Sequence, residues 1–580
     1  MTFAASVEAR LAALAPDQRA AATASPGPVL CVAPAGSGKT TTLVARIAWL
    51  VASGAPPEVI TAVTFNRRAA EELDARVTAA LHALETTKAR PRIRTFHALG
   101  REILRDAGVD VSRLVDRATF FGELFPDQSA WLLRGFDDAF SRLKLDVRPT
   151  RAALEAASAR RETARGRRGR SGPFDGLDVD RRVARAYLLY DTALESAGAL
   201  DFDDLVVRSL ECLQSDARLL DRWRERCRHL LVDEVQDVDR SQLDLAVLLA
   251  GEDRRIFLVG DDDQTIYAWR LADVRRVIGL ASRLPGLRRV DLIVNYRCPA
   301  PVVERAVRLV ARNRERFAKE IRPRREAAGR LLLAPLPSDD VTRARRVLSR
   351  WIGEGLPRDA ALGATGEDAA GAPSAATSGG THGERFAVLA RTNVELAPFA
   401  AVALEMGIAF SAQEHRLALD DPDVDGLVDR AATASGPDAP PLVALGSVDR
   451  DGDVGRLVAT LLEWAAPYPT LSALRDAIVV ARERLSRLHR NDAALVLATV
   501  HGTKGLEFDH VAVVGLDEGR FPSRRSLEEA QDPRRALEEE RRLAYVAWTR
   551  AKRSLTLLYD PGAPSAFLRD AFSDQELAAA

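Results

Sequence analysis

The chain has 580 residues, which is too long for a single core and predicts about three or four domains. Hydrophobic residues make up 47% and charged residues 29%, as in ordinary soluble proteins, and no apolar run approaches the roughly 20 residues that span a bilayer. Lysine plus arginine equals aspartate plus glutamate at 83 each, so any nucleic-acid surface must be local. The N-terminus does not resemble a secretory signal, and the four cysteines lack disulfide-like or ligand-like spacing. We therefore expect a cytoplasmic protein with no membrane role.

The first informative segment is a predicted strand over residues 29–32, followed by a loop of small residues and a helix that starts near Lys39. This order is typical of a phosphate-binding P-loop, although Ala33 stands where glycine is usual. Glycine lets backbone N–H groups face phosphates, Lys39 neutralises the β- and γ-phosphate oxygens, and the Thr40 hydroxyl suits Mg²⁺. The predicted nucleotide-binding set in this segment is Ala33, Pro34, Ala35, Gly36, Ser37, Gly38, Lys39, Thr40, Thr41 and Arg46.

The alternation of strand-like and helical patterns predicts an α/β fold with parallel sheets and crossover helices. Residues 101–199 are mainly helical in pattern, with a basic, glycine-containing break at 160–172 that we expect to be a solvated loop. Residues 356–384 are rich in small residues and predict a flexible loop. The predicted domains are a first α/β domain (1–100 and 200–290), its helical insertion (101–199), a second α/β domain (291–410 and 494–580) and a small helical insertion (411–493).

A buried strand is also predicted at residues 230–232, and it ends in Asp233 and Glu234. A carboxylate at Asp233 suits the coordination sphere of Mg²⁺, and Glu234 suits the base that orients an attacking water. Taken alone, such a pair is more often a charge cluster at a helix N-terminus. The P-loop upstream favours catalysis.

Residues 255–259 predict another buried strand, which ends at Gly260 and delivers three aspartates and Gln264 to the carboxyl edge of the sheet. Ligands of α/β proteins bind at this edge. Tyr267, Trp269 and Arg270 follow at once. One interpretation is a surface turn followed by an amphipathic helix. In the other, Gln264 senses the γ-phosphate or the attacking water while the aromatic residues stack on bases.

Two arginines are candidates for stabilising the charge that develops in phosphoryl transfer. Arg297 ends the string Val-Asn-Tyr-Arg, and Arg550 lies near the end of a string that starts with three consecutive glutamates. An arbitrary arginine is usually a solvated surface residue, so both assignments depend on the surrounding strings.

With these strings in place, the chain resembles the UvrD/Rep-like superfamily 1A DNA helicases along nearly all of its length. The resemblance implies two RecA-like P-loop motor domains, each with a helical insertion, and ATP as the nucleotide. By resemblance, Gln18 reads the adenine, Tyr296 stacks on it and Glu507 faces the nucleotide. Lys39, Asp233, Glu234, Gln264, Arg297 and Arg550 are then the catalytic set, with Thr40 and Asp233 as metal ligands. The residues implied to contact single-stranded DNA are Thr64, Phe65, His97, Phe202, Tyr267, Trp269, Arg270, Arg391, Asn393 and His501.

Some positions depart from the family pattern. Asn66 and Arg67 stand where the family usually has threonine and asparagine, and Val235 replaces a common phenylalanine. The second insertion, 411–493, is much shorter than is usual in the family, which favours weak or partner-dependent separation of duplexes. The chain also ends soon after the final motif, so we expect any nuclease to be a separate polypeptide.

The leading hypothesis is an ATP- and Mg²⁺-dependent helicase that moves 3′ to 5′ on single-stranded DNA and unwinds duplex at single-strand/double-strand junctions, in repair or recombination. Its polarity comes only from the resemblance. An alternative is a single-strand translocase, or the motor subunit of a nuclease complex, with repair or nuclease proteins as partners. A non-enzymatic nucleic-acid scaffold is the third hypothesis, and the complete catalytic set disfavours it.

Overall fold

The computed structural model describes residues 3–82, 89–159, 180–324, 328–336, 339–358, 383–412, 423–448, 457–458, 461–462 and 465–579. The chain divides into two compact units. Unit 1 comprises Met1–Ile293 and Glu315–Lys319, and unit 2 comprises Val294–Arg314 and Glu320–Ala580. The short segment Glu315–Lys319 therefore packs with unit 1, although the residues on both sides of it belong to unit 2. Among the described residues, no helix has both the length and the apolar character needed to cross a membrane.

Unit 1 is built on a six-stranded parallel sheet with the order β3-β2-β4-β5-β1-β6. Its four central strands, β2, β4, β5 and β1, are buried along their whole length because both faces of the sheet are covered, whereas the edge strands β3 and β6 carry arginines. Side chains alternate between the faces, so Leu30 and Val32 enter one core and Val29 and Cys31 enter the other. The strands are β1 (Val29–Val32), β2 (Ile60–Thr64), β3 (Arg92–Thr95), β4 (His229–Val232), β5 (Ile256–Gly260) and β6 (Arg288–Asp291).

Helices cover the two faces of this sheet. The core of one face is closed by α3 (Lys39–Ala52) and α4 (Arg67–Leu81). The core of the other face is closed by α5 (Phe96–Asp106), α10 (Asp204–Ser215), α11 (Ala217–Arg226) and α12 (Arg240–Ala250). The remaining helices of unit 1 outside the insertion are α1 (Phe3–Ala12), α2 (Pro16–Ala22), α13 (Val274–Ile278) and α14 (Leu280–Arg283).

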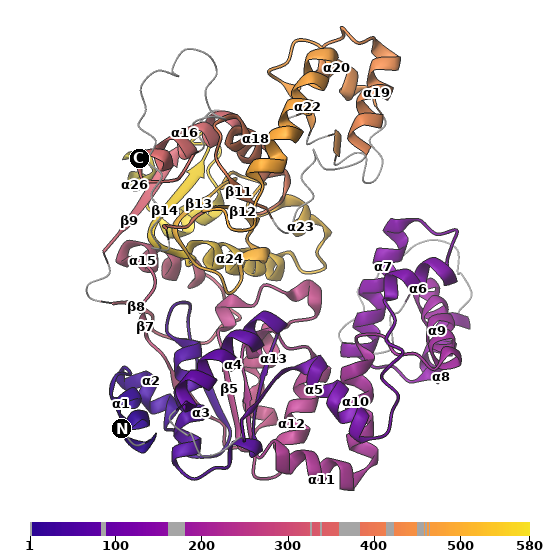
Figure 1. The fold of residues 1–580 in the computed structure, drawn as a ribbon, viewed down its shortest axis with the longest axis vertical. Helices are drawn as coiled ribbons and strands as arrows, with labels where there is room; N and C mark the ends of the chain where they lie inside the picture. Colours follow the sequence, from indigo (N-terminus) through magenta and orange to yellow (C-terminus); the bar gives the residue numbers. More distant parts are fainter. Residues whose placement is uncertain are drawn as a thin grey trace. The chain divides into compact units, whose positions relative to one another are not determined.

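The segment between α5 and α10 forms a separate helical cluster with its own core (Figure 1). Aromatic residues dominate that core, and Phe140 packs edge-on against Phe121 and Tyr187. The helices are α6 (Arg117–Leu124), α7 (Ala130–Arg142), a π-helical turn (Leu143–Val147), α8 (Arg151–Ala159) and α9 (Arg181–Ala197). The solvated loop predicted at 160–172 lies outside the described residues.

Unit 2 contains a second six-stranded parallel sheet, with the order β11-β12-β10-β13-β14-β9. Its strands are β9 (Arg330–Pro335), β10 (Phe386–Ala390), β11 (Phe410–Ser411), β12 (Leu495–Thr499), β13 (Phe508–Val513) and β14 (Ala551–Tyr559). A two-stranded parallel pair, β7 (Val294–Asn295) and β8 (Arg322–Pro323), accompanies it. The packed helices are α15 (Ala300–Val310), α16 (Asp340–Gly353), α18 (Ala397–Glu405), α23 (Arg524–Glu529), α24 (Pro533–Trp548), α25 (Ala566–Ala571) and α26 (Asp574–Ala579). Two parallel α/β sheets were predicted, and this prediction is confirmed.

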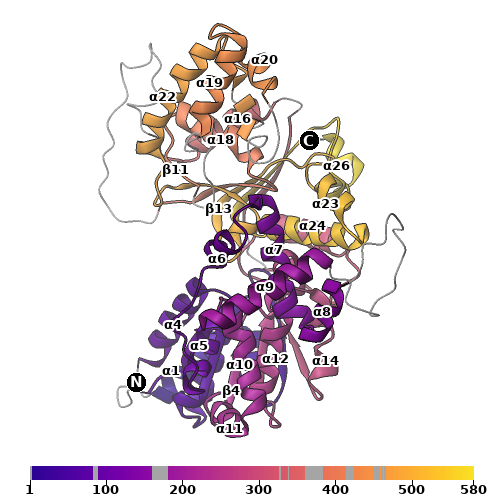
Figure 2. The same cartoon turned by 90° about the vertical axis from the view of Figure 1, so that its right-hand side faces the viewer.

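Among the described residues between β11 and β12, three helices and a few residues between them enclose a small core of their own within unit 2 (Figure 2). The helices are α19 (Asp423–Ser435), α20 (Pro441–Gly446) and α22 (Leu471–Leu488). The flexible loop predicted at 356–384 lies largely outside the described residues. The exact domain boundaries stay predictions, and α5 runs across the one placed after residue 100.

Candidate nucleotide and nucleic-acid site

The loop between β1 and α3 has the backbone conformation that the phosphate-loop prediction requires. Gly36 and Gly38 have φ values of +69° and +85°, in the left-handed region where glycine is favoured. A Cβ atom at Gly38 would lie 2.5 Å from Nε2 of Gln18. Gln18 is buried against this loop and donates from Nε2 to the Ser37 carbonyl oxygen at 2.8 Å. The structure therefore brings Gln18 to the phosphate loop.

The same loop contains polar groups suited to an anion. Ser37 is 1% exposed, and within the described residues its hydroxyl has no hydrogen-bond partner. Buried hydroxyls are normally paired, so an unpaired one in a loop of this shape fits an anionic ligand. Lys39, Thr40 and Thr41 open the 14-residue helix α3, whose N-terminal N–H groups and dipole also favour negative charge.

Lys39 reaches the carboxylates that follow β4. Its Nζ lies 3.1 Å from Oε2 of Glu234. Burial, together with repulsion from Glu234, raises the pKa of Asp233 from its ordinary value to about 7, although Lys39 opposes this rise. Glu234 itself has a φ of +50°, a strained conformation for a residue other than glycine. The structure thus gathers Lys39, Asp233 and Glu234 at the carboxyl edge of the unit 1 sheet.

Asp261 connects this group to the loop that follows β5. Its Oδ2 accepts a hydrogen bond from the backbone N–H of Ala35 at 3.1 Å and from Nε2 of Gln264 at 2.7 Å. Its own backbone N–H donates to Oε1 of Gln236 at 3.0 Å, and Gln236 also donates to Glu234. No individual role was predicted for Asp261. The available signal was three consecutive aspartates after a buried strand, because such charges need cationic partners.

An aromatic surface begins three residues after Gln264. Tyr267 stacks on Phe65 with 5.4 Å between ring centroids, and Trp269 lies edge-on to Tyr267 at 6.1 Å. The Arg270 guanidinium lies over the Trp269 ring at 4.6 Å. Trp269 is 58% exposed, which is unusual for a large apolar side chain in a folded domain. Phe65, which follows β2, therefore lies beside Tyr267 in the loop after β5, and both residues are predicted to contact single-stranded DNA.

His97 and Phe202 form a second stacked pair, with 3.9 Å between ring centroids. Phe202 is 55% exposed. Burial, reinforced by Arg270, lowers the pKa of His97 to about 4, so the imidazole is neutral near pH 7. The neighbours of Phe202 hold it in place, because Asp201 accepts from Lys144 at 2.9 Å and Asp203 accepts from Arg117 at 2.5 Å.

In unit 2, the predicted residues Arg297, Glu507 and Arg550 lie together. Arg297 Nε donates to Oε2 of Glu507 at 2.8 Å, and Lys552 pairs with the other oxygen of Glu507 at 2.6 Å. These cations hold the pKa of Glu507 below its ordinary value, although burial opposes them. Arg550 is 2% exposed and donates to the carbonyl oxygens of Val546 and Leu506 at 3.0 and 3.1 Å. Tyr296 is 43% exposed.

The structure does not support three of the predicted contacts. Arg46 lies two turns along α3 from Lys39, donates to the carbonyls of Ala22 and Ala24, and lines a small cavity with residues at the amino ends of β4 and β5. It faces away from the phosphate loop, so its assignment to the nucleotide was wrong.

Thr64 is fully buried and donates its hydroxyl to the Asn66 carbonyl at 3.1 Å, so its side chain is not presented to DNA. Arg391 makes a forked ion pair with the buried Glu540, at 2.6 Å at its closest, which ties up its guanidinium. Among the other unit 2 candidates, Asn393 is exposed and His501 is half-buried.

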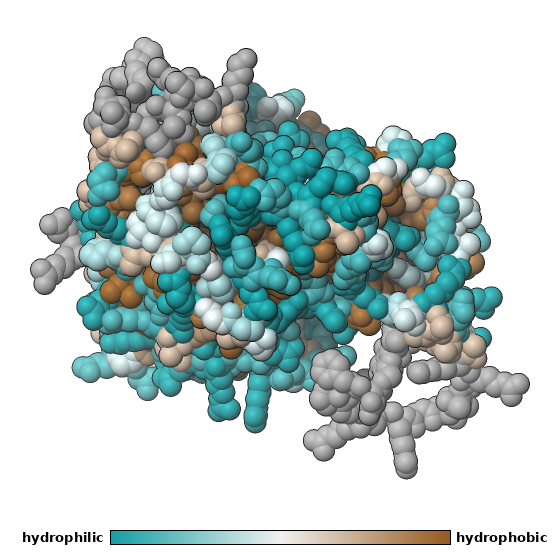
Figure 3. Space-filling model, turned by 90° about the horizontal axis from the view of Figure 1, so that it is seen from below, coloured by the Kyte–Doolittle hydropathy of each residue, from teal (hydrophilic) through white to brown (hydrophobic). Residues whose placement is uncertain are grey.

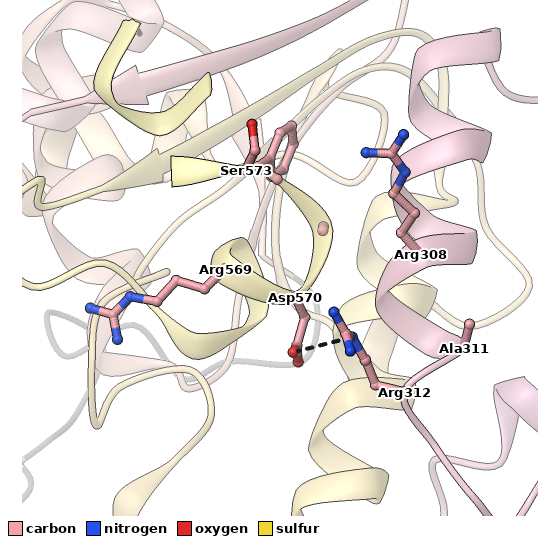
Figure 4. A pocket seen from close by; sticks show the side chains of 8 residues that line it. Arg308, Ala311, Arg312, Arg569, Asp570 and Ser573 are labelled. Carbon is pink, nitrogen blue, oxygen red and sulfur yellow. Dashed lines mark ion pairs between the residues drawn. The ribbon is translucent and has the colours of Figure 1, made fainter. Parts of the chain in front are cut away.

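A shallow hollow of about 450 Å³ in unit 2 lies apart from these residues (Figure 4). Arg312 points toward Asp570 across it, at 3.8 Å, while Arg569 points away. None of the predicted site residues lines it. Figure 3 shows one face of the molecule, which is mainly hydrophilic with apolar residues in small, separated areas. The candidate site therefore does not include this hollow and consists of the loops that follow the strands.

The sequence of this chain is similar to the sequences of known proteins. The profile of the UvrD/REP helicase N-terminal domain matches residues 14–284, and that of the UvrD-like helicase C-terminal domain matches residues 465–561. DNA helicase II of Escherichia coli (strain K12) is 29% identical over 93% of this chain and 84% of its own length. ATP-dependent DNA helicase UvrD2 of Mycobacterium tuberculosis (strain ATCC 25618 / H37Rv) is 31% identical over 94% of this chain and 78% of its own length.

The chain belongs to the UvrD/Rep-like helicases. A further relative, ATP-dependent DNA helicase Rep of Escherichia coli (strain K12), is 34% identical over 53% of the chain and 45% of its own length. In this UvrD/Rep-like chain the N-terminal match contains the phosphate loop, Asp233, Glu234 and the segment from Asp261 to Arg270. The C-terminal match contains His501, Glu507 and Arg550.

Proposed function

We propose that this chain is an ATP-dependent DNA helicase that couples ATP hydrolysis to 3′-to-5′ movement on single-stranded DNA and to duplex unwinding at junctions, in repair or recombination. The observation that carries this proposal is the loop after β5. Asp261 binds both the phosphate loop and Gln264, and the exposed aromatic surface starts three residues later. One short loop thus bears groups suited to phosphate and groups suited to bases.

The residues around the phosphate loop suit ATP hydrolysis. Lys39 is placed to neutralise phosphate charge, Glu234 to orient the attacking water, and Gln264 to contact that water or the γ-phosphate. We assign charge stabilisation in the transition state to Arg297 and Arg550. The Thr40 hydroxyl and the buried Asp233 carboxylate are hard oxygen donors, and burial together with Glu234 raises the pKa of Asp233 although Lys39 opposes this rise. These donors fit Mg²⁺, which when bound neutralises charge on the β- and γ-phosphates.

The aromatic surface suits a strand of any sequence. Stacking on an aromatic side chain contributes about 1–3 kcal/mol per base and depends little on base identity. Trp269 and Phe202 are the most exposed of these aromatic rings, and Arg270 adds positive charge beside Trp269. We assign the strand contacts to Phe65, His97, Phe202, Tyr267, Trp269 and Arg270.

A second candidate function follows from the small insertion in unit 2. The described part of its core involves only α19, α20, α22 and a few residues between them. A motor with so small an insertion fits a single-strand translocase, or the motor subunit of a nuclease complex, that unwinds little duplex alone. Strand displacement from a 3′-tailed duplex by the purified chain separates the two, because strong unwinding contradicts the second candidate.

The ATP site is tested by Lys39→Ala. Removing the ammonium leaves the phosphate charge uncompensated, so hydrolysis stimulated by single-stranded DNA should fall at least about 100-fold. Phosphate release with and without oligonucleotide measures it. Arg345→Ala removes an exposed arginine paired with Glu405 and should leave the rate unchanged. Full stimulated hydrolysis in Lys39→Ala would refute the assigned site.

A further inference from the structure

We propose that Lys319, assisted by Arg316, is a positioning residue for ATP hydrolysis that fixes Asp261, and through it Gln264 and the backbone of Ala35. Lys319 Nζ lies 2.6 Å from Oδ1 of Asp261 and 2.9 Å from Oδ2 of Asp263, and it also binds Asp262. Its side chain is 1% exposed, and those of the three aspartates are 0% exposed. The ammonium group is therefore enclosed by the acidic loop that follows β5.

Neighbours of Lys319 complete this enclosure. Arg316 makes two parallel hydrogen bonds to Asp263, from Nε at 2.9 Å and from a terminal nitrogen at 2.7 Å. The backbone N–H of Phe317 donates to Oδ2 of Asp262 at 2.8 Å. Each of the three aspartates thus accepts a hydrogen bond or makes an ion pair from the segment Glu315–Lys319. The three carboxylates are spaced closely enough to hold a cation, and the Lys319 ammonium binds all three.

The charges explain why this contact is demanding. Three carboxylates with two cations leave one negative charge when all are ionised, and burial together with the neighbouring aspartates raises the pKa of Asp262 to about 6 even though Lys319 opposes it. Without Lys319, Asp261 would also lose its cationic partner, and Asp263 would keep only Arg316. Removing one partner of a buried pair is strongly unfavourable, so the loop must protonate or move.

Asp261 transmits any such movement to the nucleotide site. One of its oxygens accepts from Lys319, and the other accepts from both Ala35 N–H and Gln264. Lys319 is therefore one residue removed from the phosphate loop and from the proposed γ-phosphate sensor. It also lies at the end of the segment where the chain leaves unit 1 for unit 2.

The inference rests on the proposed function, because a positioning role needs a reaction to position. The test compares the full-length wild-type chain with Lys319→Met, which keeps the length of the side chain and removes its charge, and with Arg316→Gln, which removes only the contacts to Asp263. For each chain, kcat and KM for ATP are measured with single-stranded DNA, together with the affinity for ADP and the Tm.

We expect kcat of Lys319→Met to fall about 10- to 100-fold, since misplacing catalytic groups by about 1 Å has effects of this size. ADP lacks the γ-phosphate that Gln264 would contact, so its Kd should change less than about twofold. Arg316→Gln should show the same pattern with a smaller loss of kcat. A role confined to stability would lower Tm without separating kcat from ADP affinity.

Arg343→Met is the matched control, because Arg343 is 4% exposed and pairs with Asp340 and Asp517 in unit 2. It should lower Tm and keep kcat per folded molecule. Wild-type kcat in folded Lys319→Met, or equal losses of kcat and ADP affinity, overturns the inference. If Lys319→Met does not fold, an unchanged kcat in Arg316→Gln overturns it. A wild-type chain that hydrolyses no ATP overturns the proposed function, and the inference with it.

Discussion

Asp233 is the residue at which stability and proposed function oppose each other most clearly. It is buried at the end of β4, next to Glu234, and its pKa is raised to about 7. A carboxylate in such a place is held against its preference for water. It becomes favourable only when a cation shares the site, as the proposed Mg²⁺ ligation requires.

Asp233→Asn should therefore stabilise the protein in a pH-dependent way. The unfolded chain releases this proton near pH 3.8, and the folded chain near pH 7. Between these values the folded state binds more protons, so the stability that Asp233 provides falls as the pH rises and is lowest above pH 7.

The variant should gain about 1–3 kcal/mol over wild type at pH 8 and much less at pH 5, while ATP hydrolysis is lost. Urea-unfolding midpoints of both proteins at the two pH values, without metal, measure the difference. Thr40→Val serves as a control, because it removes the other proposed metal ligand without a titratable group and should show no such pH dependence. An equal gain at both pH values would contradict the assignment.

Among single residues, the site residues that could be predicted from the sequence are those that lie next to a strand or loop motif along the chain. Lys39, Asp233 and Gln264 follow strands or small-residue loops, and local sequence therefore identifies their place at a sheet edge. Lys319 and Asp261 are different. Their roles depend on a contact across 58 positions of sequence, between a loop and a segment without any motif. Arg46 was misplaced because proximity to the phosphate loop in sequence does not show how far a helix carries a side chain, about 1.5 Å per residue.

Helices α5 and α10 determine where the stacked rings of His97 and Phe202 lie. α5 begins next to His97, and α10 begins two residues after Phe202. The two helices touch at Gly100, where an added Cβ would lie 2.2 Å from the Leu205 carbonyl oxygen. This close approach needs glycine and brings the two rings together.

Gly100→Ala should push α5 and α10 apart. We expect a loss of about 1–3 kcal/mol in unfolding free energy, and weaker binding of single-stranded DNA because the His97–Phe202 stack is disturbed. Unfolding midpoints and oligonucleotide anisotropy measure the two effects. Gly122→Ala in α6 is the control, since nothing lies within 4 Å of the added atom. It should be neutral or stabilising by up to about 1 kcal/mol. Unchanged stability in Gly100→Ala would contradict the packing.

The sequence located the strands better than it located the ends of the insertions. β1 and β5 lie within one residue of their predicted positions, because buried parallel strands are short apolar runs ended by polar residues. α5 runs past the predicted boundary at residue 100, and its Leu99 and Ile103 belong to the core of unit 1. A helix that packs on a sheet and a helix that packs within an insertion have the same periodicity of apolar residues, so only the observed packing tells them apart.

At the scale of the whole molecule, the two units carry different parts of the proposed machinery. Unit 1 holds the phosphate loop, the acidic pair and the aromatic surface, while unit 2 holds Arg297, Glu507 and Arg550. The UvrD/REP helicase N-terminal domain matches residues of unit 1, and the UvrD-like helicase C-terminal domain matches residues of unit 2. Movement on DNA requires that the aromatic surface grip the strand differently in different nucleotide states.

ATP-driven displacement of streptavidin from biotin at either end of a single-stranded oligonucleotide isolates movement along the strand, because it needs no unwinding. We expect displacement from the 5′ end that requires ATP, and none from the 3′ end. Trp269→Ala should keep ATP hydrolysis measured without DNA, yet lose displacement, since one lost stacking contact weakens the grip about 5- to 150-fold. Val443→Ala, at an exposed position in the small insertion, should behave as wild type. No displacement from the 5′ end by the wild-type chain would contradict 3′-to-5′ movement, and full displacement by Trp269→Ala would contradict the role of the aromatic surface in it.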